Sequence, residues 1–485
     1  MQILLEKVRR IFGRRGRKLG VVLIVALTCL VTVRALGQAQ GEGKLGKDAT
    51  DKIDRIVERA LEQMGAPSAS VAIVLDGQIA YVHAYGDAKI APKTAARPEM
   101  KYSLGSISKQ FTATAVLMLA EQGKLSVDDT VSKYLPDLTR ANEVTIRQLL
   151  SHTSGYQDYW PQDYVPPFMM QVVTSQKILD LWAKKPLDFD PGTKWQYSNT
   201  NYVIAGVIVE KVSGMPLLQF LQQRVFDPLG MQHIDNVDLH KLGDTDATGY
   251  MRYALGPPRV APKEGAGWLF AAGELAMPAS ELVKWDIGML RQQLLKPATY
   301  TEMETEVKLK NGRGAGYALG LSTGNVAGHR AFRHGGEVSG FTAQNIVFPD
   351  DNAAVAVLTN QDSNGAAGLI ARQIAAVVLT PANPVTARKL EQAREIFADL
   401  QLGKIDRSLF TDNANSYFDA QAIRDFASSL GPLGEPQDFV AGGEQGRGGM
   451  LFRRYSVVFA NKTLEITIYE MPDGKIEQYL VGAGN

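Results

Sequence analysis

The stretch 101-KYSLGSISKQFTATAVLMLAEQGKL-125 decides how the surrounding sequence is interpreted. Residues 110–120 carry no charge, which is typical of a helix that is buried on every side. Lys109 stands at the beginning of this helix, and Ser106 lies three residues before it. At that spacing a hydroxyl and an ammonium group share one face of a helix, so the two side chains are expected to meet at its first turn.

A serine and a lysine in contact are suited to nucleophilic catalysis. A serine hydroxyl is a poor nucleophile until a base takes its proton, and a lysine held in a dry pocket can lose its own proton. The N–H groups at the helix N-terminus also favour negative charge on a reacting oxygen. The structural alternative is a lysine whose stem covers apolar surface while its ammonium group reaches water. Ser-x-x-Lys occurs once here, about as often as chance predicts, so the motif alone does not decide.

The composition indicates a folded protein without a cofactor. The chain has 485 residues, and its 45% hydrophobic and 21% charged residues are ordinary for a globular protein of two or three domains. The formal net charge of +1 is uninformative, but the only dense run of basic residues lies in the first eighteen residues, so no basic field indicates a nucleic-acid partner. The single cysteine, Cys29, and six scattered histidines without a His-Glu-x-x-His arrangement predict neither disulfides nor a metal site.

The N-terminus has the pattern of an export signal. Basic residues precede an apolar run over residues 19–33, and Ala35 and Gly37 behind it are suited to a cleavage site. We expect residues 1–39 to be a secretory signal peptide and the mature protein to be periplasmic or extracellular. The alternative is an uncleaved signal anchor that associates the chain with a membrane, although the apolar run is short for a span.

The segment 51–379 reads as one α+β domain behind a linker at residues 40–50. A helix is expected over 51–64, and Asp76-Gly77 between two alternating apolar runs predicts a two-residue hairpin. Three strands are expected within 331–362, followed by a helix to about residue 379. Two early and three late strands with helices between them predict a mixed antiparallel sheet that is assembled from both ends of the domain and flanked by helices.

A second, smaller α+β domain is expected over residues 389–485. The Pro-rich stretch 380-TPANPV-385 predicts a linker over 380–388. Beyond it the pattern predicts a helix ending at Gly403, a second helix capped by Asp419, and three strands between residues 450 and 481. Helices followed by a meander resemble the cone-like, nuclear-transport-factor-like fold in the order of their elements.

Further motifs follow the Ser-x-x-Lys motif along the chain. The stretch 195-WQYSNTNY-202 holds the only Tyr-x-Asn of the chain, Tyr197-Ser198-Asn199, and "RHGG" places His334, Gly335 and Gly336 on a predicted strand. Together with "LLSHTSG" and "AAGELAMPASELVKW", these motifs resemble the serine β-lactamase and penicillin-binding protein superfamily. The nearest branch contains class C β-lactamases, D-Ala-D-Ala carboxypeptidases and family VIII esterases. The resemblance covers about residues 51–379 and implies a β-lactamase/transpeptidase-like fold with a helical subdomain.

The resemblance implies catalytic roles for three residues. Ser106 resembles the acylated nucleophile and Lys109 the partner that helps to deprotonate it. Tyr197, made acidic by neighbouring cations, resembles the base that serves Ser106 and later activates the deacylating water. His152 in "SHTSG" is interpreted as a structural turn residue.

The resemblance also implies substrate-binding residues. Asn199 is expected to hold Lys109 and the substrate amide. The backbone N–H groups of Ser106 and Glu337 are expected to form an oxyanion hole. Gly335 and Gly336 are expected to let the substrate backbone approach their strand.

One departure from the family pattern concerns substrate choice. The family most often has Lys-Thr-Gly or Lys-Ser-Gly where this sequence has His334-Gly335-Gly336, and that lysine pairs with a substrate carboxylate. A histidine carries only part of a charge near neutral pH and reaches less far. Recognition of a free carboxylate is therefore not expected of this chain.

These observations predict an exported serine hydrolase that acts through an acyl-enzyme on esters, amides or D-amino-acid peptides. Its partner is a small-molecule or peptide substrate, and the sequence indicates no oligomeric state. One alternative is a D-Ala-D-Ala carboxypeptidase or weak β-lactamase acting on cell-wall peptides. Another is a receptor that becomes acylated and does not turn over. Acylation needs the same residues in all three cases, so the motifs do not separate them.

Overall fold

The computed structural model describes residues 45–379, 384–436, 438–459 and 462–483. The predicted signal and most of the first linker lie outside these residues, as do residues 380–383 of the second linker. Both remain predictions.

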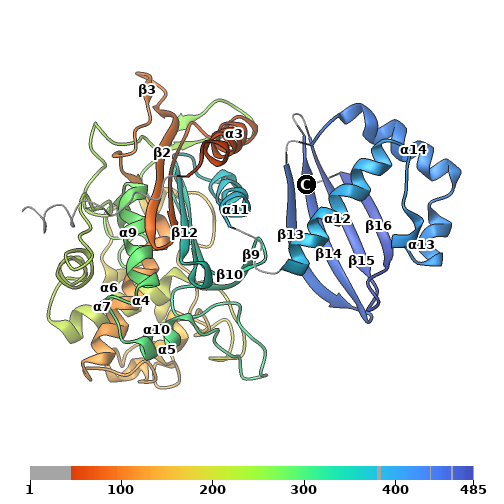
Figure 1. Cartoon of the computed structure of the whole chain (residues 1–485). Helices are drawn as coiled ribbons and strands as arrows, with labels where there is room; N and C mark the ends of the chain where they lie inside the picture. Colours follow the sequence, from red (N-terminus) through yellow and green to blue (C-terminus); the bar gives the residue numbers. More distant parts are fainter. Residues whose placement is uncertain (1–44, 380–383, 437, 460–461, 484–485) are drawn as a thin grey trace, which may run out of the picture. The chain divides into compact units, whose positions relative to one another are not determined.

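A seven-stranded sheet forms the centre of the first domain, in the order β3-β2-β1-β12-β11-β10-β9 (Figure 1). All its strand pairs are antiparallel. Strand β1 pairs with β12, so early and late segments of the domain meet in one sheet, as predicted. The strands are β1 Ser68–Leu75, β2 Gln78–Lys89, β3 Thr94–Ala95, β9 Ser322–Val326, β10 His329–Val338, β11 Phe341–Phe348 and β12 Ala353–Thr359.

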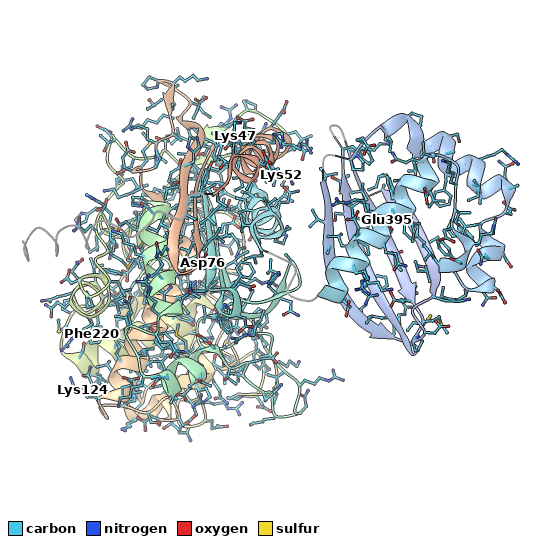
Figure 2. All side chains as sticks on the ribbon, in the orientation of Figure 1. Lys47, Lys52, Asp76, Lys124, Phe220 and Glu395 are labelled. Atoms are coloured by element: carbon cyan, nitrogen blue, oxygen red, sulfur yellow. The ribbon has the colours of Figure 1, made fainter. Side chains whose placement is uncertain are left out.

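The predicted hairpin between β1 and β2 is confirmed. Asp76 and Gly77 have φ angles of 51° and 69°, the positive values that a two-residue turn matched to strand twist requires. The Gly77 N–H donates to the carbonyl of Asn352 at 2.8 Å, which ties the turn to the residue before β12. Figure 2 marks Asp76 at this turn.

Each face of the sheet is covered by its own apolar core. Val71 and Ile73 of β1 face the core formed with helices α3 and α11. Ala72 and Val74 face the larger core, which contains the helix α4. This alternation is the period of two expected for a buried strand. The helices are α3 Lys47–Met64, α11 Ala366–Val378, α4 Ser108–Glu121, α7 Asn199–Ser213 and α9 Ala279–Leu290.

Helix α4 runs through the larger core. Every residue from Ser108 to Leu119 is buried, which explains why this segment carries no charge beyond Lys109. Short helices of the helical subdomain surround it, namely α5 Ile146–Leu150, α6 Ser175–Ile178, α8 Leu217–Leu221 and α10 Pro297–Glu304. The short strands β4 Tyr102–Ser103, β8 Leu275–Met277 and β5 Asp235–Asn236 form a small sheet, and β6 Tyr250–Met251 pairs with β7 Arg259–Val260.

The C-terminal segment has a separate sheet in the order β13-β14-β15-β16 and its own apolar core. Asp419 caps α14 by accepting hydrogen bonds from the N–H groups of Gln421 and Ala422, as predicted. Helix α12 begins at Pro384, within the predicted linker 380–388, and the first strand of this sheet was not predicted. The elements are α12 Pro384–Gln401, α13 Asp412–Tyr417, α14 Ala420–Leu430, β13 Asp438–Arg447, β14 Met450–Val458, β15 Thr463–Glu470 and β16 Ile476–Ala483.

Within the described ranges, no single helix has the length and apolar character needed to cross a membrane. Only the bent pair Asn199–Ser213 and Leu217–Phe226 meets that test together.

Candidate active site

Lys109 lies at the buried start of α4, in contact with Ser106. Ser106 belongs to the short 3-10 helix η1 (Gly105–Ile107), and α4 begins directly after it. The Lys109 side chain is fully buried. Its Nζ lies 2.9 Å from Ser106 Oγ, 2.7 Å from Asn199 Oδ1 and 2.8 Å from the carbonyl oxygen of Ala272. The alternative of a lysine that reaches water is therefore wrong.

The contacts of Lys109 suit a neutral amine. Burial lowers the pKa of Lys109 to about 7, while the negative charge of Asp158 opposes this shift. A neutral amine has two N–H donors and one lone pair. Asn199 Oδ1 and the Ala272 carbonyl can only accept, so they take both donors. The lone pair then faces the Ser106 hydroxyl, which is the arrangement that proton removal requires.

Asp158 fixes the amide of Asn199. The Asn199 backbone N–H and its Nδ2 donate to Asp158 Oδ1 at 3.0 and 3.2 Å. These bonds orient the amide so that its oxygen faces Lys109, as expected for Asn199. Both ends of the amide are engaged within the protein, which leaves it less free to hold a substrate amide than predicted. No sequence motif marks Asp158, so its role was missed.

Tyr197 lies beside the pair but differs from its predicted state. Its hydroxyl is buried without a hydrogen-bond partner, and Lys109 Nζ lies 4.9 Å from its ring centroid. Burial raises the pKa of Tyr197, although the nearby Ser106 hydroxyl opposes the shift. The prediction of an acidic tyrosine is therefore wrong, because desolvation dominates at Tyr197 and burial also lowers the pKa of Lys109, the cation expected to acidify it. Tyr197 is a neutral phenol.

The imidazole of His152 packs against the ring of Tyr197. The two ring centroids are 4.2 Å apart, and His152 Nδ1 accepts a hydrogen bond from the Ser198 backbone N–H at 3.2 Å. The side chain is fully buried, and burial lowers its pKa well below the usual value. A neutral histidine in these contacts positions the Tyr197 loop.

The backbone of strand β10 packs closely against the backbone of the turn that carries Ser106. Strand β9 pairs with β10 only as far as Arg333, which leaves the following residues free on that side. Gly105 has a φ of 54°, and a Cβ atom there would lie 2.7 Å from the backbone nitrogen of Glu337. This contact places the main chain of Glu337 beside the Ser106 turn, as an oxyanion hole requires.

The two glycines before Glu337 have different roles. A Cβ atom on Gly336 would lie 1.8 Å from the carbonyl oxygen of Leu104, whereas a Cβ atom on Gly335 would have no neighbour closer than 3.8 Å. Gly336 is thus required for the packing of β10 on the Ser106 turn, rather than for substrate approach as predicted. Neither glycine lines the cavity described below.

Gly336→Ala is expected to destabilise the protein. The added methyl group displaces β10 from Leu104, and overpacking of this kind costs about 1–3 kcal/mol. Urea denaturation measures the change in the free energy of unfolding. Gly335→Ala is the matched control, since its methyl group would make only ordinary van der Waals contacts. Equal stability of the two variants would contradict the close packing at Leu104.

His334 lies behind the site rather than in it. Its side chain is buried, and Nε2 lies 2.7 Å from the hydroxyl of Tyr317. Burial and the charge of Lys109 lower the pKa of His334 to about 3. His334 does not line the cavity beside Ser106. Its prediction as a substrate-binding residue is not supported by this placement, and the imidazole stays neutral throughout the physiological range.

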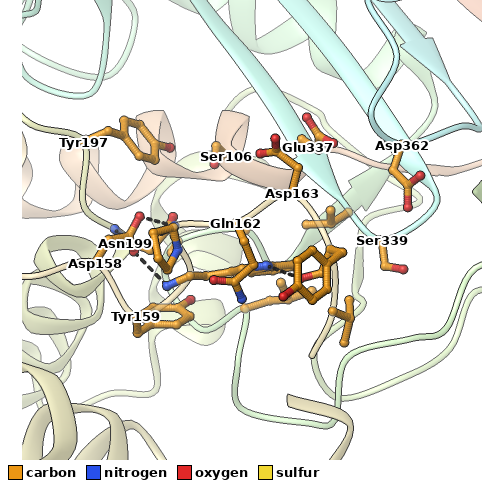
Figure 3. Close-up of a pocket in the computed structure, with 18 of the residues that line it drawn as sticks. Ser106, Asp158, Tyr159, Gln162, Asp163, Tyr197, Asn199, Glu337, Ser339 and Asp362 are labelled. Carbon is orange, nitrogen blue, oxygen red and sulfur yellow. Dashed lines mark hydrogen bonds between the residues drawn. The ribbon is translucent and has the colours of Figure 1, made fainter. Parts of the chain in front are cut away.

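A cavity of about 660 Å³ opens beside Ser106 (Figure 3). Four predicted site residues line it, namely Ser106, Tyr197, Asn199 and Glu337. Trp160 lines it as well. Several carboxylates were missed by sequence reasoning because they come from loops without a motif: Asp158, Asp163, Asp188 and Asp362.

Comparisons with known proteins agree with this geometry. A family model described as Beta-lactamase matches residues 53–379. Penicillin-binding protein 4* of Bacillus subtilis (strain 168) is 27% identical over 356 residues, which are 70% of this chain and 77% of that relative.

Two solved structures are also similar. A D-stereospecific amidohydrolase from Streptomyces sp. is 26% identical with a TM-score of 0.58, covering 68% of this chain and 98% of its own. The octameric penicillin-binding protein homologue from Pyrococcus abyssi shares the fold, with 22% identity and a TM-score of 0.61. The match covers 89% of this chain and 99% of that homologue. Because the family model spans the sheet, helix α4 and all residues around Lys109, this chain belongs to the Beta-lactamase family.

Proposed function

We propose that this protein is a serine hydrolase that cleaves esters or amides through an acyl-enzyme. The observation that carries the proposal is the 2.9 Å contact between Lys109 Nζ and Ser106 Oγ, with both other Lys109 partners being acceptors. Such a lysine is suited to take the serine proton as Oγ attacks the acyl carbon.

In acylation, Ser106 Oγ bonds to the acyl carbon while its proton passes to Lys109. The carbonyl oxygen becomes an oxyanion, which the N–H groups of Ser106 and Glu337 stabilise. The bond to the leaving group then breaks, and the leaving nitrogen or oxygen takes the proton from Lys109, directly or through the Tyr197 hydroxyl. Tyr197 suits this relay because its buried hydroxyl has no other partner.

Deacylation repeats these steps with water. Neutral Lys109 accepts a proton from the water, directly or through the Tyr197 hydroxyl, as the water oxygen bonds to the acyl carbon. The bond to Ser106 Oγ breaks, the proton returns to Oγ, and the free acid leaves.

The similarity to a D-stereospecific amidohydrolase and to a penicillin-binding protein favours amides with a D-configured acyl group as substrates. None of the described residues that line the cavity is lysine or arginine, and His334 is neutral. Both observations favour substrates without a free carboxylate over the carboxypeptidase and β-lactamase alternatives.

Steady-state hydrolysis of p-nitrophenyl acetate tests the proposal. A hydrolase continues to release p-nitrophenol over many turnovers. A receptor that becomes acylated releases about one equivalent per protein and stops. A single burst without further release would therefore contradict the proposed function.

A further inference from the structure

A buried acid and a buried amide meet between helix α9 and the central sheet, away from the catalytic residues. Asp286 belongs to α9 and Asn345 to β11, and the two residues are 0% and 1% exposed. Helix α9 lies on the face of the sheet opposite to α3 and α11 (Figure 1). Asn345 Nδ2 donates a hydrogen bond to Asp286 Oδ1 at 2.7 Å. The catalytic steps proposed above use neither residue.

The second oxygen of each side chain lacks a donor. Among the described residues, neither Asp286 Oδ2 nor Asn345 Oδ1 has a hydrogen-bond partner, although both atoms are buried. The hydroxyl of Ser70 points from β1 to the same face of the sheet, but it has no partner either and so satisfies neither oxygen. Buried polar atoms are normally paired. An ionised carboxylate only accepts hydrogen bonds, so it would leave both oxygens without a partner.

The side chains that the neighbouring elements place around Asp286 carry no compensating charge within the described residues. The strands beneath α9 present apolar side chains on this face apart from Ser70 and Asn345, namely Ala72, Val74, Ala343, Val347, Ala354, Ala356 and Leu358. Helix α4 contributes Gln110, which accepts a hydrogen bond from Trp285 Nε1 at 2.9 Å. Strand β10 contributes His334, which lies opposite Asn345 and is neutral, because burial lowers its pKa to about 3.

The charged residues of α9 itself are engaged elsewhere. Lys284 donates to Glu281 at 2.9 Å, and Arg291 donates to the carbonyl of Gly77 at 2.8 Å. In the described part of the chain, no lysine, arginine or histidine nitrogen lies within 4.0 Å of Asp286. The titratable side chains in the middle of β2 are on the opposite face, where they contact α3 or one another: Tyr81, His83 and Tyr85. An ionised Asp286 would therefore be an uncompensated buried charge.

We propose that Asp286 is a protonated acid that forms a cyclic pair with the amide of Asn345 and fastens α9 to the sheet. Asp286 Oδ2 carries the proton and donates it to Asn345 Oδ1, while Asn345 Nδ2 donates to Asp286 Oδ1. A single proton thus removes the buried charge and gives both unpaired oxygens a partner. Burial raises the pKa of Asp286 to about 8, which agrees with a group that is protonated at neutral pH.

The pair makes the stability of the first domain sensitive to pH. An aspartate in the unfolded chain ionises near pH 3.9, whereas Asp286 in the folded chain keeps its proton up to about pH 8. The stabilisation is fully present below about pH 4 and is lost progressively as the pH rises to about 8. A salt-bridged aspartate has the opposite effect. The contact lies behind the nucleophile helix, since Trp285 packs on Phe111 of α4 with ring centroids 4.6 Å apart.

Asp286→Asn tests the proposal, because an asparagine can form both hydrogen bonds of the pair without titrating. Urea denaturation of the wild type and the variant is compared from pH 5 to 9. All five tryptophans lie between residues 160 and 285, so their fluorescence reports the unfolding of the first domain. The unfolding constant of the wild type relative to the variant is expected to rise about tenfold per pH unit up to about pH 8 and then to level off. A ratio that is constant, or that falls with pH, would overturn the proposal.

Asp180→Asn is the matched control. Asp180 is exposed and pairs with Lys184, so its carboxylate is ionised in both the folded and the unfolded chain between pH 5 and 9. The corresponding ratio for this variant is expected to change by less than about twofold over the whole range. An equal rise in both variants would show that the slope does not come from Asp286.

A second measurement uses the wild type alone and does not depend on the folding of a variant. In protein labelled with ¹³C at the aspartate carboxyl carbons, one carboxyl resonance is expected to titrate near pH 8, whereas exposed aspartates titrate near pH 4. Asp286→Asn is expected to remove that resonance. A wild-type spectrum in which no aspartate carboxyl group is still protonated at pH 7 would overturn the proposal, whatever the activity of the protein.

Discussion

Ser106→Ala is expected to abolish covalent labelling by a fluorescent fluorophosphonate and to lower kcat/KM for p-nitrophenyl acetate by on the order of a thousandfold or more. Among the hydrogen-bond partners of Lys109 in the described residues, Ser106 Oγ is the only oxygen that can form a bond to the acyl carbon, and the substitution removes it. The other Lys109 partners are amide oxygens, which are not nucleophiles. Labelling is read by in-gel fluorescence and hydrolysis by the release of p-nitrophenol.

Ser339→Ala is the matched control. Ser339 lines the same cavity, but its hydroxyl donates to the carbonyl of Pro262, which cannot take its proton. The control is expected to keep full labelling. Labelling that persists in Ser106→Ala, or that disappears only in Ser339→Ala, would show that another residue is the nucleophile.

The activity is expected to rise with pH through the neutral range, with an apparent pKa near 7. Lys109 accepts the Ser106 proton only in its neutral form, and burial lowers its pKa to about 7. Protonated Lys109 predominates below this value and is inactive, whereas above it the free amine predominates. The profile of kcat/KM for p-nitrophenyl acetate, measured from about pH 5 to 9, reports this free-enzyme ionisation.

Lys109→Arg tests which group titrates. A guanidinium keeps its proton throughout this range, so the variant is expected to lose activity by on the order of a hundredfold or more and to lose the rise near pH 7. Tyr197→Phe is expected to lower kcat but to keep the midpoint, because the pKa of Tyr197 is raised by burial and no phenolate forms near neutrality. A midpoint that disappears in Tyr197→Phe and remains in Lys109→Arg would assign the base to the tyrosine.

Local patterns predicted most of the fold. The uncharged run after Lys109 is a helix with all its faces buried, and Asp76-Gly77 is the hairpin turn. Strand β13 was missed because its sequence, "DFVAGGEQGR", is rich in glycine and carries little apolar alternation. It is held by its pairing with β14, which is a tertiary effect.

The site residues that belong to a sequence motif were predicted, whereas the residues that reach the cavity from separate loops were not. Ser106, Lys109 and Asn199 meet as their spacing and family resemblance implied. Asp158, Asp163 and Asp362 reach the cavity from separate segments that no pattern links. The states of Tyr197 and His334 also depend on burial by residues distant in sequence, such as Tyr317 beside His334. Desolvation of this kind is not visible in a motif.

The pairing of β1 with β12 has a consequence for how the chain acquires activity. Ala69 lies opposite Thr359 in the centre of the sheet, so nearly 300 residues separate partners that must meet. Contacts of such long range make folding slow. Glu337 reaches the Ser106 turn only as part of the strands that β12 joins to β1. A growing chain that has produced Ser106 and Lys109 therefore lacks the Glu337 backbone beside them, and we expect the proposed nucleophile to stay inactive until the domain is almost complete.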